Sequence, residues 1–356
     1  MFILEQALTL TTPFQNVWRL PSMIGAGSTM RSLWETLLAF SDRSARLIEE
    51  TLSRSPPLAG GRQPVFSIFM GLFERLAVDN QCFSQEGSVV GSIVGFVIAF
   101  VLVIWVLLPL LQAALLRSKN RHAFVVGHRG AAGLAPENTI PAIEAGIRHG
   151  VRAVEVDVHR TKDGKLVVMH DTSVDRTTRS SGEIRSLTWE QVRHLDAGDH
   201  FSSAYAGTSV PTLGEVIDRV LEAECSLVIE VKDPSYYPGI AQDLAVLLAE
   251  KADKDRVIVI SFDVAWLGHF HTIAPDVRLG QLHLWGGGWP DIPGTAVVDV
   301  YWRSVFIDPT LIWRVRRRGY RCWVWTVNKP GIARLLWALG VEAVTTDRPD
   351  RVQAPA

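Results

Sequence analysis

Cysteine is scarce in this chain, and the few cysteines are far apart. Cys82, Cys225 and Cys322 are the only three among 356 residues, and no two of them form a C-x-x-C pair. A disulfide framework or a thiolate zinc site is therefore not expected. The chain also lacks a strong charge of either sign, since its formal net charge is −1. This near-neutrality argues against a broad nucleic-acid-binding surface, so we expect no nucleic-acid partner.

Charge is missing altogether from one long apolar segment. Residues 89–108 read VVGSIVGFVIAFVLVIWVLL, and apolar character continues to residue 116. A helix of about 20 residues spans about 30 Å, the thickness of a bilayer's hydrocarbon core. We therefore predict a single transmembrane helix within residues 87–116. A buried core helix is the alternative, but charge-free runs of this length are rare in soluble domains.

The segments on either side of the apolar run differ in charge. Residues 1–86 carry no motif for chemistry, but leucines and isoleucines at helical spacing in residues 31–53 predict an N-terminal helical region. On the other side, the linker 117–123 is basic, with arginine or lysine at 117, 119 and 121. Because positive charge favours the cytoplasmic end of a span, we expect a single-pass membrane protein whose C-terminal domain is cytoplasmic.

Beyond this linker, short apolar runs rich in β-branched residues alternate with helical stretches. The candidate strands are 124–128, 153–159, 166–170, 226–233, 256–263, 277–283, 304–309, 321–328 and 342–347. The helical stretches include 138–149, 212–223, 238–252, 311–318 and 329–339. Repeated strand–helix units predict an α/β fold, a TIM (β/α)8 barrel over residues 124–350. A TIM barrel has eight strands, so one of the nine candidates is an additional short strand or is misassigned. The stretch TKDGK at 161–165, between two candidates, indicates a hairpin turn and not a helical crossover.

Acidic residues lie toward the ends of two predicted strands, on the face where TIM barrels carry their active sites. Glu155 and Asp157 share one face of their strand because side chains alternate, and Glu230 is near the end of another strand. Carboxylates turned into a barrel repel each other, and a divalent cation would offset this repulsion. Oxygen ligands favour Mg²⁺ or Ca²⁺. Solvated carboxylates, or ion pairs with arginine and lysine, are the alternative.

Cations and imidazoles occupy further strand ends. Arg129 can fork onto a phosphate, and Lys232 can add a point charge. Histidine is the side chain best suited to proton transfer at physiological pH, so His128 and His170 are candidates for proton transfer on both sides of a displacement. A lone histidine would more often be structural. Two imidazoles, two cations and a metal ion together indicate phosphodiester cleavage.

The motifs that carry these residues resemble those of the glycerophosphodiester phosphodiesterase family. They are HRGAAGLAPENT, EVDVHRTKDGKLVVMHD, DRTT, IEVK, VWTVN and TTDRP, in this order. The resemblance covers residues 124 to about 350 and implies a TIM-barrel enzyme. Such an enzyme hydrolyses glycerophosphodiesters, for example glycerophosphocholine, to glycerol 3-phosphate and an alcohol. The implied metal ligands are Glu155, Asp157 and Glu230, the acid/base pair is His128 and His170, and the phosphate-binding residues are Arg129 and Lys232.

Several candidate pocket residues have two interpretations each. Asn138 either caps the first helix or orients the site, and Trp325 either lines the pocket or packs in the barrel. Phe262 and Trp285 are weaker candidates for the pocket wall, and Asp347 is expected to anchor a loop. The sequence leaves open which histidine is the acid, whether water or a substrate hydroxyl attacks, and the oligomeric state.

The predicted span suggests a second enzymatic function. A barrel beside a bilayer could act on lysophospholipids as a lysophospholipase D and release lysophosphatidic acid. The tryptophan-rich stretch LHLWGGGWP at 282–290 would then be a candidate groove or lid. An inactive membrane scaffold is a third possibility, but it predicts a lost ligand or histidine, and all seven motif positions are intact.

Overall fold

A computed structural model describes residues 123–285, 289 and 291–355. The predicted N-terminal helical region, the predicted transmembrane helix and nearly all of the basic linker lie outside these residues. Among the described helices, none has both the length and the apolar character needed to cross a bilayer.

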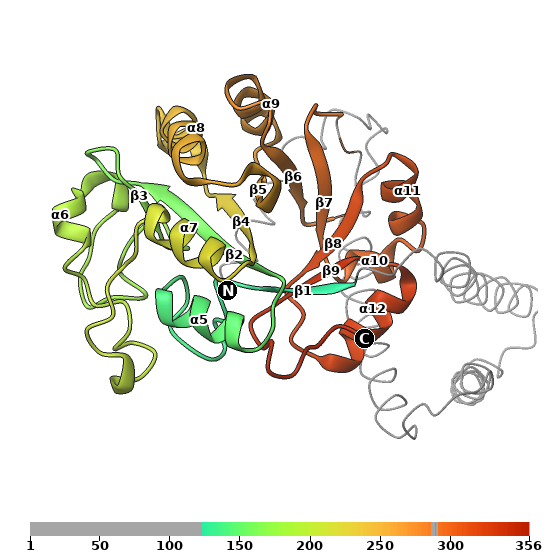
Figure 1. The fold of residues 1–356 in the computed structure, drawn as a ribbon, viewed down its shortest axis with the longest axis horizontal. Helices are drawn as coiled ribbons and strands as arrows, with labels where there is room; N and C mark the ends of the chain where they lie inside the picture. Colours follow the sequence, from blue (N-terminus) through green and yellow to red (C-terminus); the bar gives the residue numbers. More distant parts are fainter. Residues whose placement is uncertain (1–122, 286–288, 290, 356) are drawn as a thin grey trace, which may run out of the picture. The chain divides into compact units, whose positions relative to one another are not determined.

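The described part of the chain is a closed barrel of eight parallel strands with helices on its outside (Figure 1). The barrel strands are β1 (Phe124–Gly127), β2 (Ala153–Arg160), β4 (Ser226–Val231), β5 (Val257–Ser261), β6 (Arg278–His283), β7 (Thr295–Tyr301), β8 (Arg321–Trp325) and β9 (Ala343–Thr346). Closure occurs at β1, which pairs with both β2 and β9. The additional strand β3 (Leu166–Val168) pairs antiparallel with β2. The predicted TIM barrel and the predicted hairpin are both confirmed.

Helices lie between successive strands, and the longer ones cover the outside of the barrel (Figure 1). They are α5 (Ile140–Arg148), α6 (Trp189–Val192), α7 (Leu213–Glu222), α8 (Ile240–Lys251), α9 (Val264–Ile273), α10 (Ser304–Ile307), α11 (Leu311–Arg317) and α12 (Pro330–Leu339). Short 3₁₀ helices are η4 (Ile184–Ser186), η5 (Ser203–Tyr205), η6 (Pro234–Tyr236) and η7 (Lys254–Arg256).

Helix α7 shows how the sequence forms these elements. Thr212 and Glu215 make a reciprocal capping box at its start, which satisfies two free N–H groups of the first turn. Four of its apolar residues recur at the spacing of one helical face and are buried against the barrel. They are Leu213, Val216, Ile217 and Val220.

Alternation along β2 directs its carboxylates into the barrel. Val154, Val156 and Val158 belong to the large core between the strands and the helices. The residues between them therefore face the barrel interior, where Ala153 joins a smaller apolar cluster. Glu155 and Asp157 share the face of Ala153, so apolar residues on the opposite face fix their direction.

One predicted strand is wrong and one strand was missed. Residues 304–309 were predicted as a strand, but they hold helix α10, and the true strand is β7 at Thr295–Tyr301. Short apolar runs fit either element, because too few residues are present to establish a period. In β7, the buried Asp299 interrupts the run of valines, which hides its apolar character in the sequence.

Candidate active site

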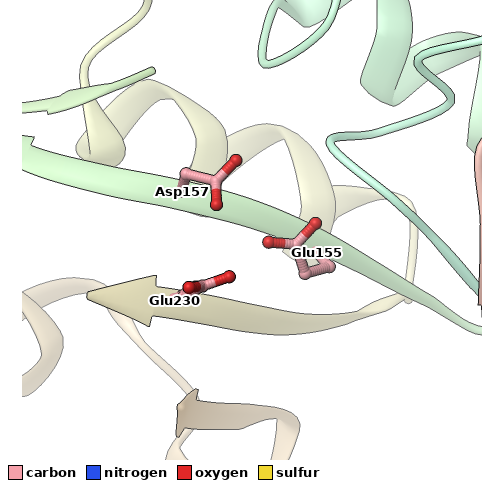
Figure 2. Close-up of side chains that lie close together, drawn as sticks. All are labelled: Glu155, Asp157 and Glu230. Carbon is pink, nitrogen blue, oxygen red and sulfur yellow. The ribbon is translucent and has the colours of Figure 1, made fainter. Parts of the chain in front are cut away.

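Three carboxylates converge inside the barrel (Figure 2). Glu155 and Asp157 come from β2 and Glu230 comes from β4, where the parallel register pairs Asp157 with Glu230. Each residue offers an oxygen, and these oxygens lie within 4.8 Å of one another. The three residues are only 4%, 1% and 8% exposed, respectively. The predicted ligands are therefore brought together in the interior and are not turned to solvent.

The electrostatics of these carboxylates fit a cation site. Burial raises the pKa of Glu155 well above its ordinary value, and repulsion from Asp157 and Glu230 raises it further. Burial likewise raises the pKa of Glu230. The buried Oε1 atom of Glu155 accepts no hydrogen bond from any described residue. A concentrated set of hard oxygen donors with an unsatisfied atom is suited to Mg²⁺ or Ca²⁺.

Two basic side chains border the carboxylates. The Lys232 Nζ atom lies 2.9 Å from Glu230 Oε1 and 3.3 Å from Asp157 Oδ1. The Arg129 Nε atom lies 3.4 Å from Asp157 Oδ2. Burial alone would raise the pKa of Asp157, but Lys232 and Arg129 outweigh it and lower that pKa. Burial disfavours charge on Lys232, yet Glu230 and Asp157 raise its pKa above the usual value. Both basic groups therefore stay charged beside the site.

Each predicted catalytic histidine has a carboxylate partner at Nδ1. The His128 Nδ1 atom lies 2.6 Å from Asp347 Oδ1, and the His170 Nδ1 atom lies 2.6 Å from Asp171 Oδ1. Asn328 donates from Nδ2 to the other oxygen of Asp347 at 2.6 Å. A histidine that donates Nδ1–H to a carboxylate presents Nε2 for proton transfer. Asp347 thus does more than anchor a loop, which is the role that the sequence suggested.

Arg176 joins the two halves of the site and was not identified from the sequence. Its Nε donates to Asp171 Oδ2 at 2.6 Å, and its terminal nitrogens donate to the two oxygens of Glu137 at 2.6 and 3.0 Å. Glu137 also accepts from Arg129 Nη1 at 2.9 Å. Arg176 therefore connects the partner of His170 to the partner of Arg129. Its position in the DRTT motif was the available signal.

Asn138 orients a predicted metal ligand and does not cap the helix. It donates from Nδ2 to Asp157 Oδ2 at 2.8 Å and accepts from the Asp157 backbone N–H at 3.1 Å. Its φ of 59° is in the left-handed region, which asparagine tolerates better than most residues. The cap of α5 is Thr139, whose hydroxyl oxygen accepts from the Ala142 N–H.

Aromatic side chains line another part of the same barrel end. The Trp325 ring lies 5.8 Å from Phe262 and 5.6 Å from Tyr301, measured between centroids. Trp325 is half-buried, whereas Phe262 is 45% and Trp285 is 52% exposed. These residues follow or end β5, β6, β7 and β8. Trp325 therefore belongs to an aromatic wall at the barrel mouth, and Trp285 is exposed beside β6.

An open cleft borders the first motif, and Arg129, which contacts Asp157, is the part of its lining that reaches the carboxylates. Its volume is about 480 Å³. The residues that line it are His128, Arg129, Ala132, Gly133, Glu137, Asn328, Asp347 and Arg348. The histidine and the arginine of the first motif therefore face a cavity large enough for a small phosphodiester.

The chain matches known proteins over the barrel. The model of the glycerophosphoryl diester phosphodiesterase family matches residues 128–351. A glycerophosphodiester phosphodiesterase of Caldanaerobacter subterraneus is 33% identical over 64% of this chain and 94% of its own length. A Bacillus subtilis enzyme of the same name is 32% identical over 63% of this chain and 83% of its own length.

Solved structures agree with these matches. An Oleispira antarctica phosphodiesterase, in complex with the product sn-glycerol-3-phosphate, aligns with a TM-score of 0.60 at 25% identity. The alignment covers 64% of this chain and 94% of that one. An Agrobacterium tumefaciens glycerophosphodiester phosphodiesterase aligns with a TM-score of 0.57 at 26% identity, over 64% and 97% of the two chains.

The barrel and its site define an enzyme of phosphodiester hydrolysis. The chain belongs to the glycerophosphoryl diester phosphodiesterase family, and it is a phosphoric diester hydrolase.

Proposed function

We propose that this enzyme is a membrane-anchored phosphodiesterase that depends on a divalent cation and cleaves glycerophosphodiesters to glycerol 3-phosphate and an alcohol. The observation that carries the proposal is the convergence of three buried carboxylates with two carboxylate-paired histidines at one barrel end. The phosphodiesterase of known structure that holds sn-glycerol-3-phosphate supports a substrate of this size.

The cation, Mg²⁺ or Ca²⁺, would be held by Glu155, Asp157 and Glu230. When bound, it supplies positive charge that offsets the charge developing on the phosphoryl oxygens. Arg129 and Lys232 add two fixed positive charges at the same place, so the phosphate group is bound through its oxygens.

The two histidines carry the proton transfers. One imidazole accepts a proton from the nucleophile, which is water or a neighbouring hydroxyl of the substrate, and the other gives a proton to the departing alkoxide oxygen. Asp347 and Asp171 stabilise the imidazolium that forms on His128 or His170. Each transfer of this kind contributes about 10² to 10⁴ in rate.

A lysophospholipid is the second candidate substrate. The exposed Phe262, Leu284 and Trp285 lie at the ends of β5 and β6, where they could contact an acyl chain. The cleft itself is lined mainly by charged and polar side chains, which supports a water-soluble diester as the first candidate. Trp325 is a further candidate pocket residue, whereas the buried Asn138 acts on the site through Asp157.

Membrane anchoring and a cytoplasmic catalytic domain are proposed from the sequence. The charge-free run 89–108 and the basic linker 117–123 support them. Cys82 precedes the run, whereas Cys225 and Cys322 are buried in the barrel. A membrane-impermeant maleimide added to intact cells should therefore label Cys82 and not the barrel. If Cys82 is labelled only after the cells are lysed, this orientation is contradicted.

The substrate and the cation are tested together. Purified full-length protein is assayed with glycerophosphocholine and with lysophosphatidylcholine, before and after EDTA and with Mg²⁺ or Ca²⁺ restored. We expect glycerophosphocholine to be hydrolysed, EDTA to abolish the reaction and a cation to restore it. Hydrolysis of the lysophospholipid alone would replace the first candidate with the second. Unchanged hydrolysis in EDTA would refute the cation requirement.

A further inference from the structure

One arc of the barrel rim is basic, and it lies at the end opposite the active site. We define this basic rim by Arg152, Arg317, Arg318 and Arg321, all of which are exposed. Arg152 directly precedes β2, Arg317 and Arg318 end α11, and Arg321 starts β8. Because the barrel strands are parallel, their first residues lie at the same rim, away from the strand ends that carry the site.

The chain enters the barrel through this arc. Strand order places β9 between β8 and β1 (Figure 1). Ala343 of β9 pairs with both Phe124 and Trp323. The rings of Phe124 and Trp323 are accordingly 5.4 Å apart. On the opposite side of β1, next to β2, the Arg152 guanidinium lies 5.4 Å from the Phe124 ring. The start of β8, at Arg321, is therefore two strand spacings, or about 10 Å, from the start of β1.

Little negative charge offsets the basic rim. The segment 311–321 contains five arginines and no acidic residue. Two carboxylates lie beside the four arginines: Glu342 lies 3.8 Å from Arg321, and Asp291 accepts a hydrogen bond from the Tyr320 hydroxyl at 2.8 Å. Within the described residues, Arg152, Arg317 and Arg318 form no ion pair with a carboxylate, and Arg318 donates to the Trp289 carbonyl oxygen at 2.7 Å. The basic rim therefore presents net positive charge to its surroundings.

An exposed tryptophan flanks the same arc. Trp313 of α11 is 44% exposed, and the Arg317 guanidinium lies 5.0 Å from its ring. Tryptophan beside clustered arginine is typical of surfaces that meet the headgroup region of a bilayer. The sequence that leads into the arc is itself basic, with three positive charges between residues 117 and 121, and follows the charge-free run 89–108.

We infer that the basic rim docks on an anionic lipid surface. Charge complementarity and continuity with the predicted span both point to a bilayer, and the net charge of −1 argues against a nucleic acid. Docking in this orientation turns the strand ends that carry the site away from the lipid. The substrate therefore enters from the water and not from the bilayer to which the rim is bound.

Hydrogen–deuterium exchange on the full chain tests the docking. The protein is reconstituted in nanodiscs of phosphatidylcholine, with or without about one third phosphatidylglycerol. We expect exchange in residues 311–321 to slow about fivefold or more on the anionic discs, and this slowing to disappear in 0.5 M salt. Equal exchange on the two lipids would overturn the inference. So would slowing that persists at high salt.

Charge reversal of the arginines tests whether the basic rim is the surface that binds lipid. The variant Arg317→Glu/Arg318→Glu/Arg321→Glu should lose the lipid-dependent slowing and keep wild-type hydrolysis of glycerophosphocholine, because none of these residues touches the site. Arg179→Glu/Arg193→Glu, on other exposed segments, is the matched control and should keep the slowing. If the triple variant does not fold, the single Arg317→Glu variant should at least halve the effect. Slowing that survives in a folded rim variant would overturn the assignment.

The inferred docking of the basic rim and the predicted transmembrane span can be refuted separately. A chain that stays in solution without detergent would contradict the predicted span but not the basic rim. In that case the protein is mixed with vesicles of the same two compositions, and cosedimentation is measured. Binding to anionic vesicles alone supports the basic rim, and binding to neither overturns it. Neither measurement requires that the site be active.

Discussion

His128 and Asp347 are 219 positions apart in sequence, and their Nδ1 and Oδ1 atoms are 2.6 Å apart. His128 follows β1 and Asp347 follows β9, two strands that pair where the barrel closes. Closure of the barrel therefore creates this pair. A second pair, His170 with Asp171, forms between neighbours in sequence. The site thus has two imidazoles that each pair with a carboxylate through Nδ1, one pair produced by the fold and one by local sequence.

The first prediction concerns Asp347. Replacing it with Asn keeps the shape but removes the negative charge that favours the reactive tautomer of His128, so kcat should fall about 10²-fold or more. Steady-state hydrolysis of glycerophosphocholine measures this. Asp199→Asn, which removes a carboxylate paired with the exposed Arg179, is the matched control and should keep the wild-type rate. A wild-type rate in Asp347→Asn would show that the pair has no part in catalysis.

The second prediction concerns the link made by Arg176. Arg176→Ala frees both Asp171 and Glu137, so kcat/KM should fall about 10- to 100-fold, the usual effect of losing such a supporting contact. The loss should include a changed pH profile, because the carboxylate beside His170 is no longer held. Arg176→Lys should recover part of the rate, and Arg179→Ala on the same loop should have no effect. If the pH profile of Arg176→Ala is unchanged, Arg176 has a structural role only and does not position the carboxylate beside His170.

The third prediction separates two adjacent residues of the first loop. Asn138→Gly tolerates the left-handed backbone and removes two hydrogen bonds to Asp157, so activity should fall and a higher cation concentration should be needed. Thr139→Ala removes the cap of α5, which should lower the free energy of unfolding by about 1 kcal/mol and leave kcat unchanged. Denaturant unfolding and cation titration of activity distinguish these results. The reverse pattern would reassign the cap and the orienting residue.

The fourth prediction is a pH dependence of stability. Burial raises the pKa of Glu155 and Glu230 above the ordinary 4.5 in the folded, metal-free chain. The folded chain then holds these protons more tightly than the unfolded chain, so their contribution to stability is lost as pH rises above 4.5. A cation needs the ionised carboxylates and reverses this loss.

Thermal unfolding with saturating cation or with EDTA measures the effect. The difference in Tm should grow between pH 5 and pH 8, and a cation at 100 times its Kd should add about 2.7 kcal/mol. For a domain of this size, that corresponds to roughly 5–10 °C. A Tm difference that shrinks as pH rises would contradict the assignment of raised pKa values. Glu230→Gln should reduce the difference at every pH.

Much of this arrangement is readable from the sequence because it depends on local patterns. The alternation in AVEVDVH places Glu155 and Asp157 on one face, and the capping box at Thr212 marks the start of α7. The same patterns gave a wrong prediction at residues 295–309. There, Asp299 interrupts the valine-rich strand β7, which was missed, and the short apolar run predicted as a strand forms α10.

The supporting contacts of the site could not be predicted in the same way. Arg176 reaches Glu137 across 39 residues, and Asp347 reaches His128 across the barrel seam. No periodicity in the sequence encodes such pairings, because they depend on how loops fold over the barrel end. Asn138 was ambiguous for a related reason, since an asparagine before a helix usually caps it. In the structure its backbone is left-handed and its side chain bonds to Asp157 instead.

The proposed reaction requires that the carboxylates of β2 and β4 share one cation. Equilibrium dialysis of the EDTA-treated full chain against Mn²⁺, with bound metal counted per chain, tests this directly. We predict one ion per wild-type chain, displaced by Mg²⁺ or Ca²⁺, and none in a folded Glu155→Gln/Glu230→Gln variant. Equal binding by the wild type and this variant would contradict the account.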